Sequence, residues 1–164
     1  MSKRLKNNIQ RVQNELQKLG FSYRVIELPK TTHTALEAAK ALSCQIGQIA
    51  KSIIFKTKST NQPILVIASG LNQIDEEKIA KHISESVEKA EANFILEKTG
   101  FIIGGVPPLG HLKKIKTFID EDLFQYEEIW AAAGAPNAVF KFKPQDLIKM
   151  TDGQIISVKQ RKVM

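Results

Sequence analysis

The chain has 164 residues, of which 43% are hydrophobic and 25% are charged, and its formal net charge is +7. This length and balance are typical of one globular domain with its own core, and they exclude a disordered or fibrous chain. A positive balance attracts polyanions such as nucleic acids. Many basic proteins bind no nucleic acid, so the charge alone leaves the partner open.

The residue types that could form cross-links or metal sites are scarce. The single cysteine, Cys44, can form neither an internal disulfide nor a metal site alone, so it is interpreted as a semi-buried filler in a cytoplasmic protein. The histidines, His33, His82 and His111, are not spaced as metal ligands, and no phosphate-loop, dinucleotide or nucleophilic-serine signature is present. We therefore expect no metal and no cofactor.

No segment of the sequence predicts export or a membrane partner. The N-terminus is basic but lacks the apolar core of a secretory signal. The longest apolar runs, such as residues 63–68, have the length of a strand and are far too short to span a membrane.

The first half of the chain predicts both helices and strands. Apolar residues recur at spacings of three and four over residues 5–19, which predicts a first helix that Gly20 ends. A strand is expected at residues 21–28. The sequence Thr34-Ala35-Leu36-Glu37 is a capping box, so a second helix is expected at residues 34–42. Further strands are expected at residues 52–55 and 63–68, and further helices at residues 75–83 and 92–99.

The second half adds four strands and one helix. The strands are expected at residues 115–119, 129–132, 138–142 and 154–158, and the helix at residues 144–150. Strands and helices mix without strict βαβ alternation, and there is no repeat and no linker. The sequence thus predicts one mixed α/β domain over residues 1–164, with a frayed basic tail at residues 159–164.

The segment Gly104-Gly105-Val106-Pro107-Pro108-Leu109-Gly110-His111 is unusual because five of its eight residues are glycine or proline. Glycines let a backbone approach a ligand, and prolines keep a loop rigid. A rigid loop that presents amide groups suits a carbonyl or an oxyanion. The segment is equally typical of a tight turn between two elements, so both interpretations stay open.

Three other positions are candidates for a ligand site. Lys51 lies at the start of an apolar strand, where it could reach a phosphate or carbonyl or could lie on the surface. His33 precedes a helix and could face a ligand or help to cap the helix. In the loop Ala133-Gly134-Ala135-Pro136-Asn137, Asn137 offers a donor and an acceptor, although ordinary turn chemistry explains it as well.

Taken in chain order, these segments resemble a known family. The order is His33-Thr34-Ala35, then Gln48-Ile49-Ala50-Lys51-Ser52, then the loop of residues 104–111, then Ala133-Gly134-Ala135-Pro136-Asn137. This pattern is similar to the YbaK/ProX-type aminoacyl-tRNA editing domain, which includes the insertion domain of bacterial prolyl-tRNA synthetases and its free-standing relatives. The resemblance covers residues 20–158.

The resemblance implies a strongly curved mixed sheet flanked by helices, and hydrolysis of the ester that joins a wrong amino acid to the 3′-terminal adenosine of tRNA. It implies that Lys51 binds near the terminal adenosine and its phosphate. Gly104 and Gly105, with the loop up to Pro108, would hold the aminoacyl carbonyl through backbone amides. The other residues that it implies in substrate binding are His33, Thr34, Val106, Pro107, Pro108, Gly110, His111, Gly134, Pro136 and Asn137.

The sequence departs from the family at one point. Several relatives carry a histidine on the wall opposite the glycine loop, where this chain has Asn137 and Ala138. A catalytic role for that histidine therefore cannot be transferred, and His111 is a candidate without an assigned role.

The function expected is a free-standing deacylase that removes a small amino acid (serine or threonine, alanine or cysteine) from mischarged tRNA. Its partners would be the aminoacylated acceptor end and, as an option, a synthetase. Two alternatives stay open: a non-catalytic module that binds tRNA or a synthetase, and a small-molecule-binding domain without an RNA partner.

Overall fold

The computed structural model describes residues 2–161. These residues form five α-helices, which are α1 (Lys3–Lys18), α2 (Ala35–Leu42), α3 (Glu76–Ile83), α4 (Ala92–Thr99) and α5 (Asp146–Thr151). They form eight strands, which are β1 (Ile26–Glu27), β2 (Ile49–Thr57), β3 (Pro63–Ser69), β4 (Val87–Lys89), β5 (Lys116–Asp120), β6 (Ile129–Ala132), β7 (Ala138–Phe142) and β8 (Gln154–Ile156). Two short 3₁₀ segments, η1 (Ile46–Gln48) and η2 (Glu121–Gln125), complete this part of the chain.

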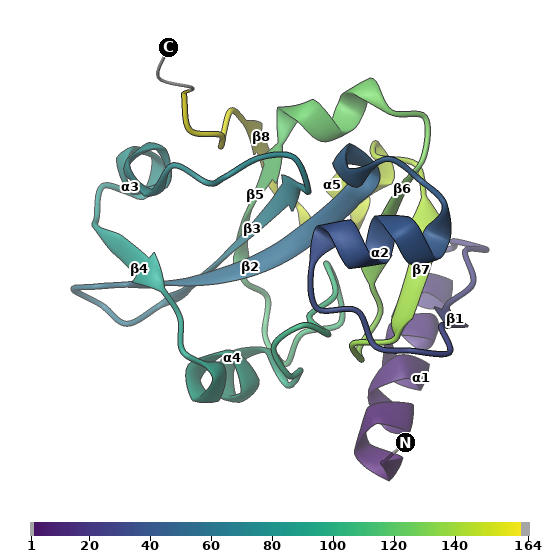
Figure 1. The fold of residues 1–164 in the computed structure, drawn as a ribbon. Helices are drawn as coiled ribbons and strands as arrows, with labels where there is room; N and C mark the ends of the chain where they lie inside the picture. Colours follow the sequence, from purple (N-terminus) through teal and green to yellow (C-terminus); the bar gives the residue numbers. More distant parts are fainter. Residues whose placement is uncertain (1, 162–164) are drawn as a thin grey trace.

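All the strands belong to one mixed sheet with the order β1-β7-β6-β2-β3-β5-β8, and β4 pairs with the far end of β2. The pairs β2·β3, β2·β4, β1·β7 and β6·β7 are antiparallel, whereas β2·β6, β3·β5 and β5·β8 are parallel. The long strand β2 crosses the middle of the sheet (Figure 1). The predicted mixed α/β class is therefore confirmed.

Side-chain caps explain where the helices begin. The hydroxyl of Thr34 accepts a hydrogen bond from the Glu37 N–H at 3.0 Å, and the Asp75 carboxylate accepts one from the Glu77 N–H at 3.0 Å. The predicted starts of α2 and α3 are therefore confirmed. The capping box differs in one bond: the Glu37 carboxylate accepts from the backbone N–H of His33 at 3.1 Å and not from that of Thr34.

The sheet is covered on both faces. The largest cluster of buried apolar side chains lies between one face and α1, and it includes Val12 and Leu16 of that helix. A second cluster lies on the other face, with Ile79 of α3 in it. Helix α2 packs through Ala38 and Ala39 on the start of β2. In Figure 1, α2 lies in front of the sheet and α1 behind it. No helix within residues 2–161 is long and apolar enough to cross a membrane.

The strand expected at residues 21–28 is wrong for most of its length, because only Ile26–Glu27 pairs with β7. The side-chain amide of Gln13 takes the place of a neighbouring strand: it donates to the Tyr23 carbonyl and accepts from the Val25 N–H, each at 2.9 Å. A side chain of α1 thus forms the hydrogen bonds that a neighbouring strand would have formed with this backbone.

The C-terminal tail also differs from the expectation. Lys159 pairs with Ile74 in an isolated bridge, and the Gln160 N–H donates to the Gln73 carbonyl at 2.8 Å. Residues 162–164 of the predicted frayed segment lie outside the described residues.

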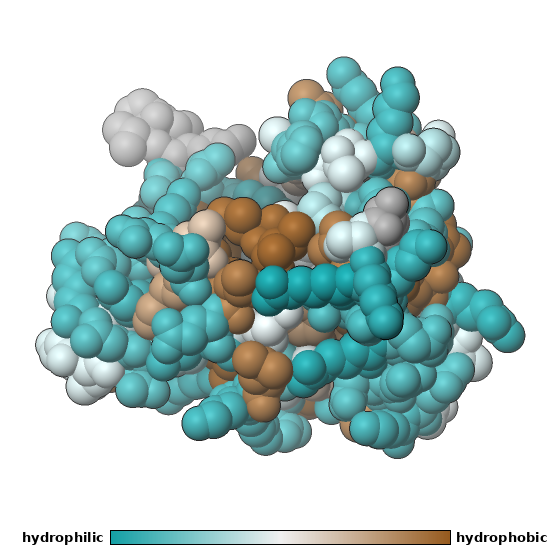
Figure 2. Space-filling model, turned by 90° about the horizontal axis from the view of Figure 1, so that it is seen from below, coloured by the Kyte–Doolittle hydropathy of each residue, from teal (hydrophilic) through white to brown (hydrophobic). Residues whose placement is uncertain are grey.

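Polar side chains cover most of the surface seen from below, and apolar side chains gather near its centre (Figure 2). In the segment between α4 and β5, the exposed apolar residues include Ile103 and Leu112, which are 60% and 54% exposed.

Candidate active site

A cavity of about 610 Å³ lies where α2, η1, the start of β2, the β6–β7 pair and the glycine–proline loop meet. The segments that carry the family resemblance all contribute to its wall, although they are far apart in the sequence. The predicted site residues that line the cavity are His33, Thr34, Lys51, Gly104, Val106 and Pro136.

The cavity lies beside an open stretch of β2. Strand β6 pairs with β2 only at Ile49 and Ala50, and β4 pairs with it only from Phe55 to Thr57. Between these pairings, Lys51 and Ser52 have a strand neighbour within the described residues on one edge only, which is β3. Both residues line the cavity, so the gap in the sheet is where a ligand can approach the backbone of β2.

Lys51 is held by a backbone carbonyl. Its Nζ donates to the carbonyl oxygen of Asn72 at 3.1 Å. Burial lowers the pKa of Lys51, and repulsion from Lys89 lowers it further, while the attraction of Asp120 opposes both. An ammonium has three N–H donors, so Lys51 keeps donors for a phosphate or a carbonyl in the cavity.

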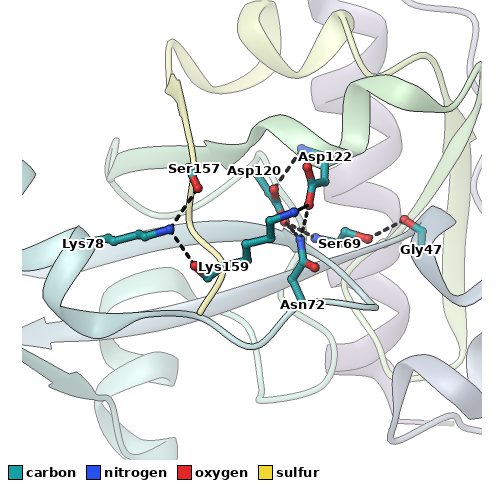
Figure 3. A network of polar contacts seen from close by, with 8 residues as sticks. All are labelled: Gly47, Ser69, Asn72, Lys78, Asp120, Asp122, Ser157 and Lys159. Atoms are coloured by element: carbon teal, nitrogen blue, oxygen red, sulfur yellow. Dashed lines mark hydrogen bonds and ion pairs between the residues drawn. The ribbon is translucent and has the colours of Figure 1, made fainter. Parts of the chain in front are cut away.

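A polar network fixes the carbonyl that Lys51 contacts (Figure 3). The side-chain amide of Asn72 donates to Asp120 and to Asp122, each at 2.8 Å. Asp120, which is only 1% exposed, also accepts from the Ser69 N–H at 3.0 Å. The Asn72 bond and Lys159, whose Nζ lies 3.2 Å from the carboxylate, lower the pKa of Asp122. Asn72 is thus anchored through its side chain while its carbonyl orients Lys51.

This network was not among the predicted site residues. The sequence contains one indication of it: Asp120 and Asp122 follow the apolar strand predicted at residues 115–119. Polar functional side chains are common in the segment that follows a strand. Asn72 gave no signal, because its partners lie about fifty residues away in the chain.

The glycine–proline loop offers fewer free amides than its composition suggests. The Gly105 N–H donates to the Ile102 carbonyl at 3.0 Å, and prolines 107 and 108 have no N–H to offer. Within the described residues, the N–H groups of Gly104 and Val106 donate no hydrogen bond, and both residues line the cavity. Of the loop's N–H groups that donate no hydrogen bond within the described residues, these two belong to residues of the cavity wall and are its candidate donors to an oxyanion.

The glycine–proline loop packs directly on the second loop. The Gly134 N–H donates to the Gly105 carbonyl at 3.0 Å. A Cβ added to Gly105 would lie 2.9 Å from the Ala135 Cα, which is too close for any side chain. Gly105 therefore sets the contact between the two loops, while Gly104 faces the cavity.

The remaining predicted residues are not among those that line the cavity. The Nε2 of His111 lies 2.7 Å from the Pro107 carbonyl, and Arg11 of α1 donates to the His111 carbonyl at 3.3 Å. The Asn137 amide donates to the Leu28 carbonyl at 3.2 Å and so fastens the second loop to the segment before α2. Pro107, Pro108, Gly110 and Gly134 likewise belong to the supporting parts of the two loops.

The half-buried position of His111 predicts a pH dependence of stability. Burial lowers its pKa below the ordinary value of 6.5, with a further push from Arg11, while the Pro107 hydrogen bond opposes the shift. A histidine with a lowered folded pKa binds its proton more weakly when folded, so its contribution to stability is present above about pH 6.5 and is lost as the pH falls. We expect urea unfolding to show a larger loss of stability between about pH 7.5 and 5.5 in the parent than in His111→Gln. Equal losses in the two proteins would contradict this role.

Several apolar residues of the wall were also missed from the sequence, because nothing in the pattern separates them from core residues. They come from α2, η1, β2, β6 and the turn after β3, and they are Leu36, Leu42, Ile46, Ile49, Leu71 and Trp130. Within residues 2–161, no group of three His, Cys, Asp or Glu side chains could hold a metal ion.

Comparison with known proteins places this geometry in a family. The chain is 28% identical over 149 residues to the multifunctional Ser/Thr-tRNA deacylase ProXp-y of Escherichia coli K12, and this alignment covers 86% of each protein. It is 28% identical over 131 residues to the uncharacterized protein YwhH of Bacillus subtilis 168, with 80% of this chain and 83% of YwhH covered. A solved structure described as a "putative trans-editing enzyme for prolyl tRNA synthetase" superposes with a TM-score of 0.88 at 38% identity, over 98% of this chain and 99% of the other. The family described as the aminoacyl-tRNA editing domain matches residues 29–150, and this chain belongs to that family.

Proposed function

We propose that this protein is a trans-acting aminoacyl-tRNA deacylase, which hydrolyses the ester of a small amino acid misattached to tRNA. The observation that carries the proposal is the cavity itself, which is lined by Lys51 and by Gly104 and Val106, two residues whose N–H groups donate no hydrogen bond within residues 2–161. Membership of the editing-domain family and the name of the E. coli relative support it.

The chemistry needs only modest help. An aminoacyl ester is activated, so a positioned water can add to its carbonyl carbon if the oxyanion that forms is stabilised. In the proposed site, the N–H groups of Gly104 and Val106 stabilise that oxyanion. The ribose oxygen then leaves with a proton, and the products are the free amino acid and a tRNA with a free 3′ end. The neighbouring 2′-hydroxyl of the terminal ribose can assist the attacking water, so no protein nucleophile is required.

Lys51 is proposed to hold the terminal nucleotide. Its ammonium lies at the open stretch of β2, and a phosphate is a strong acceptor for its free N–H groups. The segment around His33 and Thr34 and the Pro136 side of the second loop would form the rest of the wall against the adenosine.

A small amino acid fits the residues around the inner wall. Ala50, Ala131 and Ala138 line the cavity beside Val106, so short side chains surround that part of the space. A synthetase can exclude an analogue that differs by one methylene by only about 1–3 kcal/mol, and a second hydrolytic site removes the errors that remain. We favour serine and threonine over alanine and cysteine, in line with the name of the E. coli relative.

The test is a deacylation assay with purified protein over tRNAs charged with serine, threonine, alanine, cysteine and proline. We expect release of at least one small amino acid and no release of proline from its cognate tRNA. A non-catalytic module would bind these tRNAs and cleave none of them, and a small-molecule-binding domain would show no salt-dependent tRNA affinity. An increase in rate on adding a synthetase would identify the synthetase as a partner.

The proposed location is the cytoplasm, where charged tRNA is used.

The N-terminal half of α1 is proposed to contact the tRNA backbone. Residues 2–14 hold four basic and no acidic side chains, which are Lys3, Arg4, Lys6 and Arg11. Lys3, Arg4 and Lys6 are exposed, and none of them pairs with a carboxylate within residues 2–161. The Asn8 backbone of this half packs on Gly134, directly behind the second loop of the site.

The charge reversal K3E/R4E is therefore expected to lower kcat/KM for whole charged tRNA by about tenfold at low salt, and by less as salt rises. Acidic residues are favourable in the first turn of a helix, so folding should be retained. Hydrolysis of a 3′-aminoacyl adenosine, which lacks the acceptor stem, should not change. The matched control is K58E/K81E, which reverses the same number of exposed basic side chains at positions that do not line the cavity. An equal effect of both double variants would show that only net charge matters.

A further inference from the structure

The hydroxyl of Ser52 is a buried polar group that the proposed mechanism does not use. Within residues 2–161, its Oγ is the one buried side-chain nitrogen or oxygen without a hydrogen-bond partner. Buried hydroxyls nearly always have a partner, because leaving one unpaired costs free energy. Ser52 also lines the cavity, so a bound ligand can supply the missing partner.

Ser52 and Lys51 face opposite sides of the sheet. Successive residues of a strand point to opposite faces. Ser52 pairs with Ile67, which lies in the core cluster under α1, whereas Lys51 pairs with Ala68 of the second cluster. A substrate at the open edge of β2 can therefore touch the lysine on one side and the hydroxyl on the other.

The surroundings of the hydroxyl decide which part of the substrate reaches it. Ser52 shares its face with Ala50 and Ile54, and Val106 of the same core cluster lines the cavity too. Gly104, in contrast, is exposed at the mouth. Because the bulky tRNA must stay at the mouth, the amino acid side chain is the part that can reach the buried Oγ.

The polarity of that end of the cavity favours a neutral group. A single hydroxyl among apolar side chains solvates a charged α-ammonium poorly. It can both donate to and accept from another hydroxyl. We propose that Ser52 is a specificity-determining residue, whose Oγ hydrogen-bonds the side-chain hydroxyl of a seryl or threonyl ester; this rests on the deacylase function proposed above.

The test compares the parent with Ser52→Ala on tRNAs charged with serine, threonine and alanine. We expect kcat/KM to fall about tenfold or more for seryl- and threonyl-tRNA and to stay within about twofold for alanyl-tRNA, because only the hydroxylated substrates lose a partner. The melting temperature of Ser52→Ala should be unchanged or higher, since the substitution removes a hydroxyl that no described residue pairs with. Ser59→Ala, an exposed serine of the β2–β3 turn, is the control and should change none of these ratios.

The outcomes separate this proposal from the proposed function. Equal losses on all three substrates, or no loss on any, would overturn the role of Ser52 while leaving the protein a deacylase. A parent that prefers alanyl-tRNA would overturn it as well. A parent that cleaves no charged tRNA would contradict the deacylase function itself.

Discussion

Replacing Lys51 by alanine is expected to lower kcat/KM for aminoacyl-tRNA hydrolysis by about a hundredfold or more. Lys51 is the only lysine or arginine among the described residues that line the cavity, and the Asn72 carbonyl orients its Nζ. Among the described residues of the wall, no other lysine or arginine can offer its charge to a terminal phosphate. The measurement is steady-state deacylation of the substrate that the charged-tRNA panel identifies.

The fold should survive this change, because Lys51 forms no ion pair with a carboxylate within residues 2–161 and alanine leaves no charge behind. Lys56→Ala is the matched control: Lys56 lies on the same strand, outside the cavity, and pairs with Glu88 at 3.7 Å. We expect Lys56→Ala to keep nearly full activity, because an exposed ion pair contributes little to stability. Full activity of Lys51→Ala, with an unchanged melting temperature, would rule out the site assignment.

Replacing Gly134 by alanine is expected to destabilise the protein by about 2–5 kcal/mol. Gly134 has a φ of +101°, a conformation that costs a residue with a Cβ about 1–2 kcal/mol. The new Cβ would also lie 2.8 Å from the Asn8 carbonyl oxygen and 2.9 Å from its carbon, so α1 has to move away, at a further cost of about 1–3 kcal/mol. Differential scanning calorimetry should show a melting temperature lower by about 5–15 °C.

The variant Gly20→Ala separates the conformational cost of a positive φ from the steric cost of the contact with α1. Gly20 also has a positive φ, +87°, but an added Cβ would meet only the flexible tip of Lys149 at 4.0 Å. We expect this control to lose only the conformational part, about 1–2 kcal/mol. Equal losses in the two variants would mean that α1 does not press on the second loop.

The local sequence was sufficient to predict the helix starts that are set by hydrogen bonds between neighbouring residues. The Thr34 and Asp75 caps predicted the starts of α2 and α3, since a cap oxygen and the backbone N–H that donates to it are only two or three residues apart. The same reasoning was wrong for residues 21–25, because Gln13 satisfies their backbone from another element. Local rules do not detect such a partner.

The sequence by itself determined which segments belong together, because the order of its motifs resembles that of the editing family. This resemblance predicted His33, Lys51, Gly104 and Pro136 as site residues, and the fold brings all four to one cavity. Only the tertiary structure decided what each group can do there. It engages the Gly105 N–H in a turn, directs His111 toward Pro107, and anchors Asn72 under Lys51. Among residues 2–161, it also leaves the Ser52 hydroxyl without a partner at the gap in the sheet. The physical reason is that a hydrogen bond depends on the position and direction of its partner, and only the folded backbone sets both, whether the partner is a few residues away, as for Gly105 and His111, or 21 residues away, as for Lys51 and Asn72.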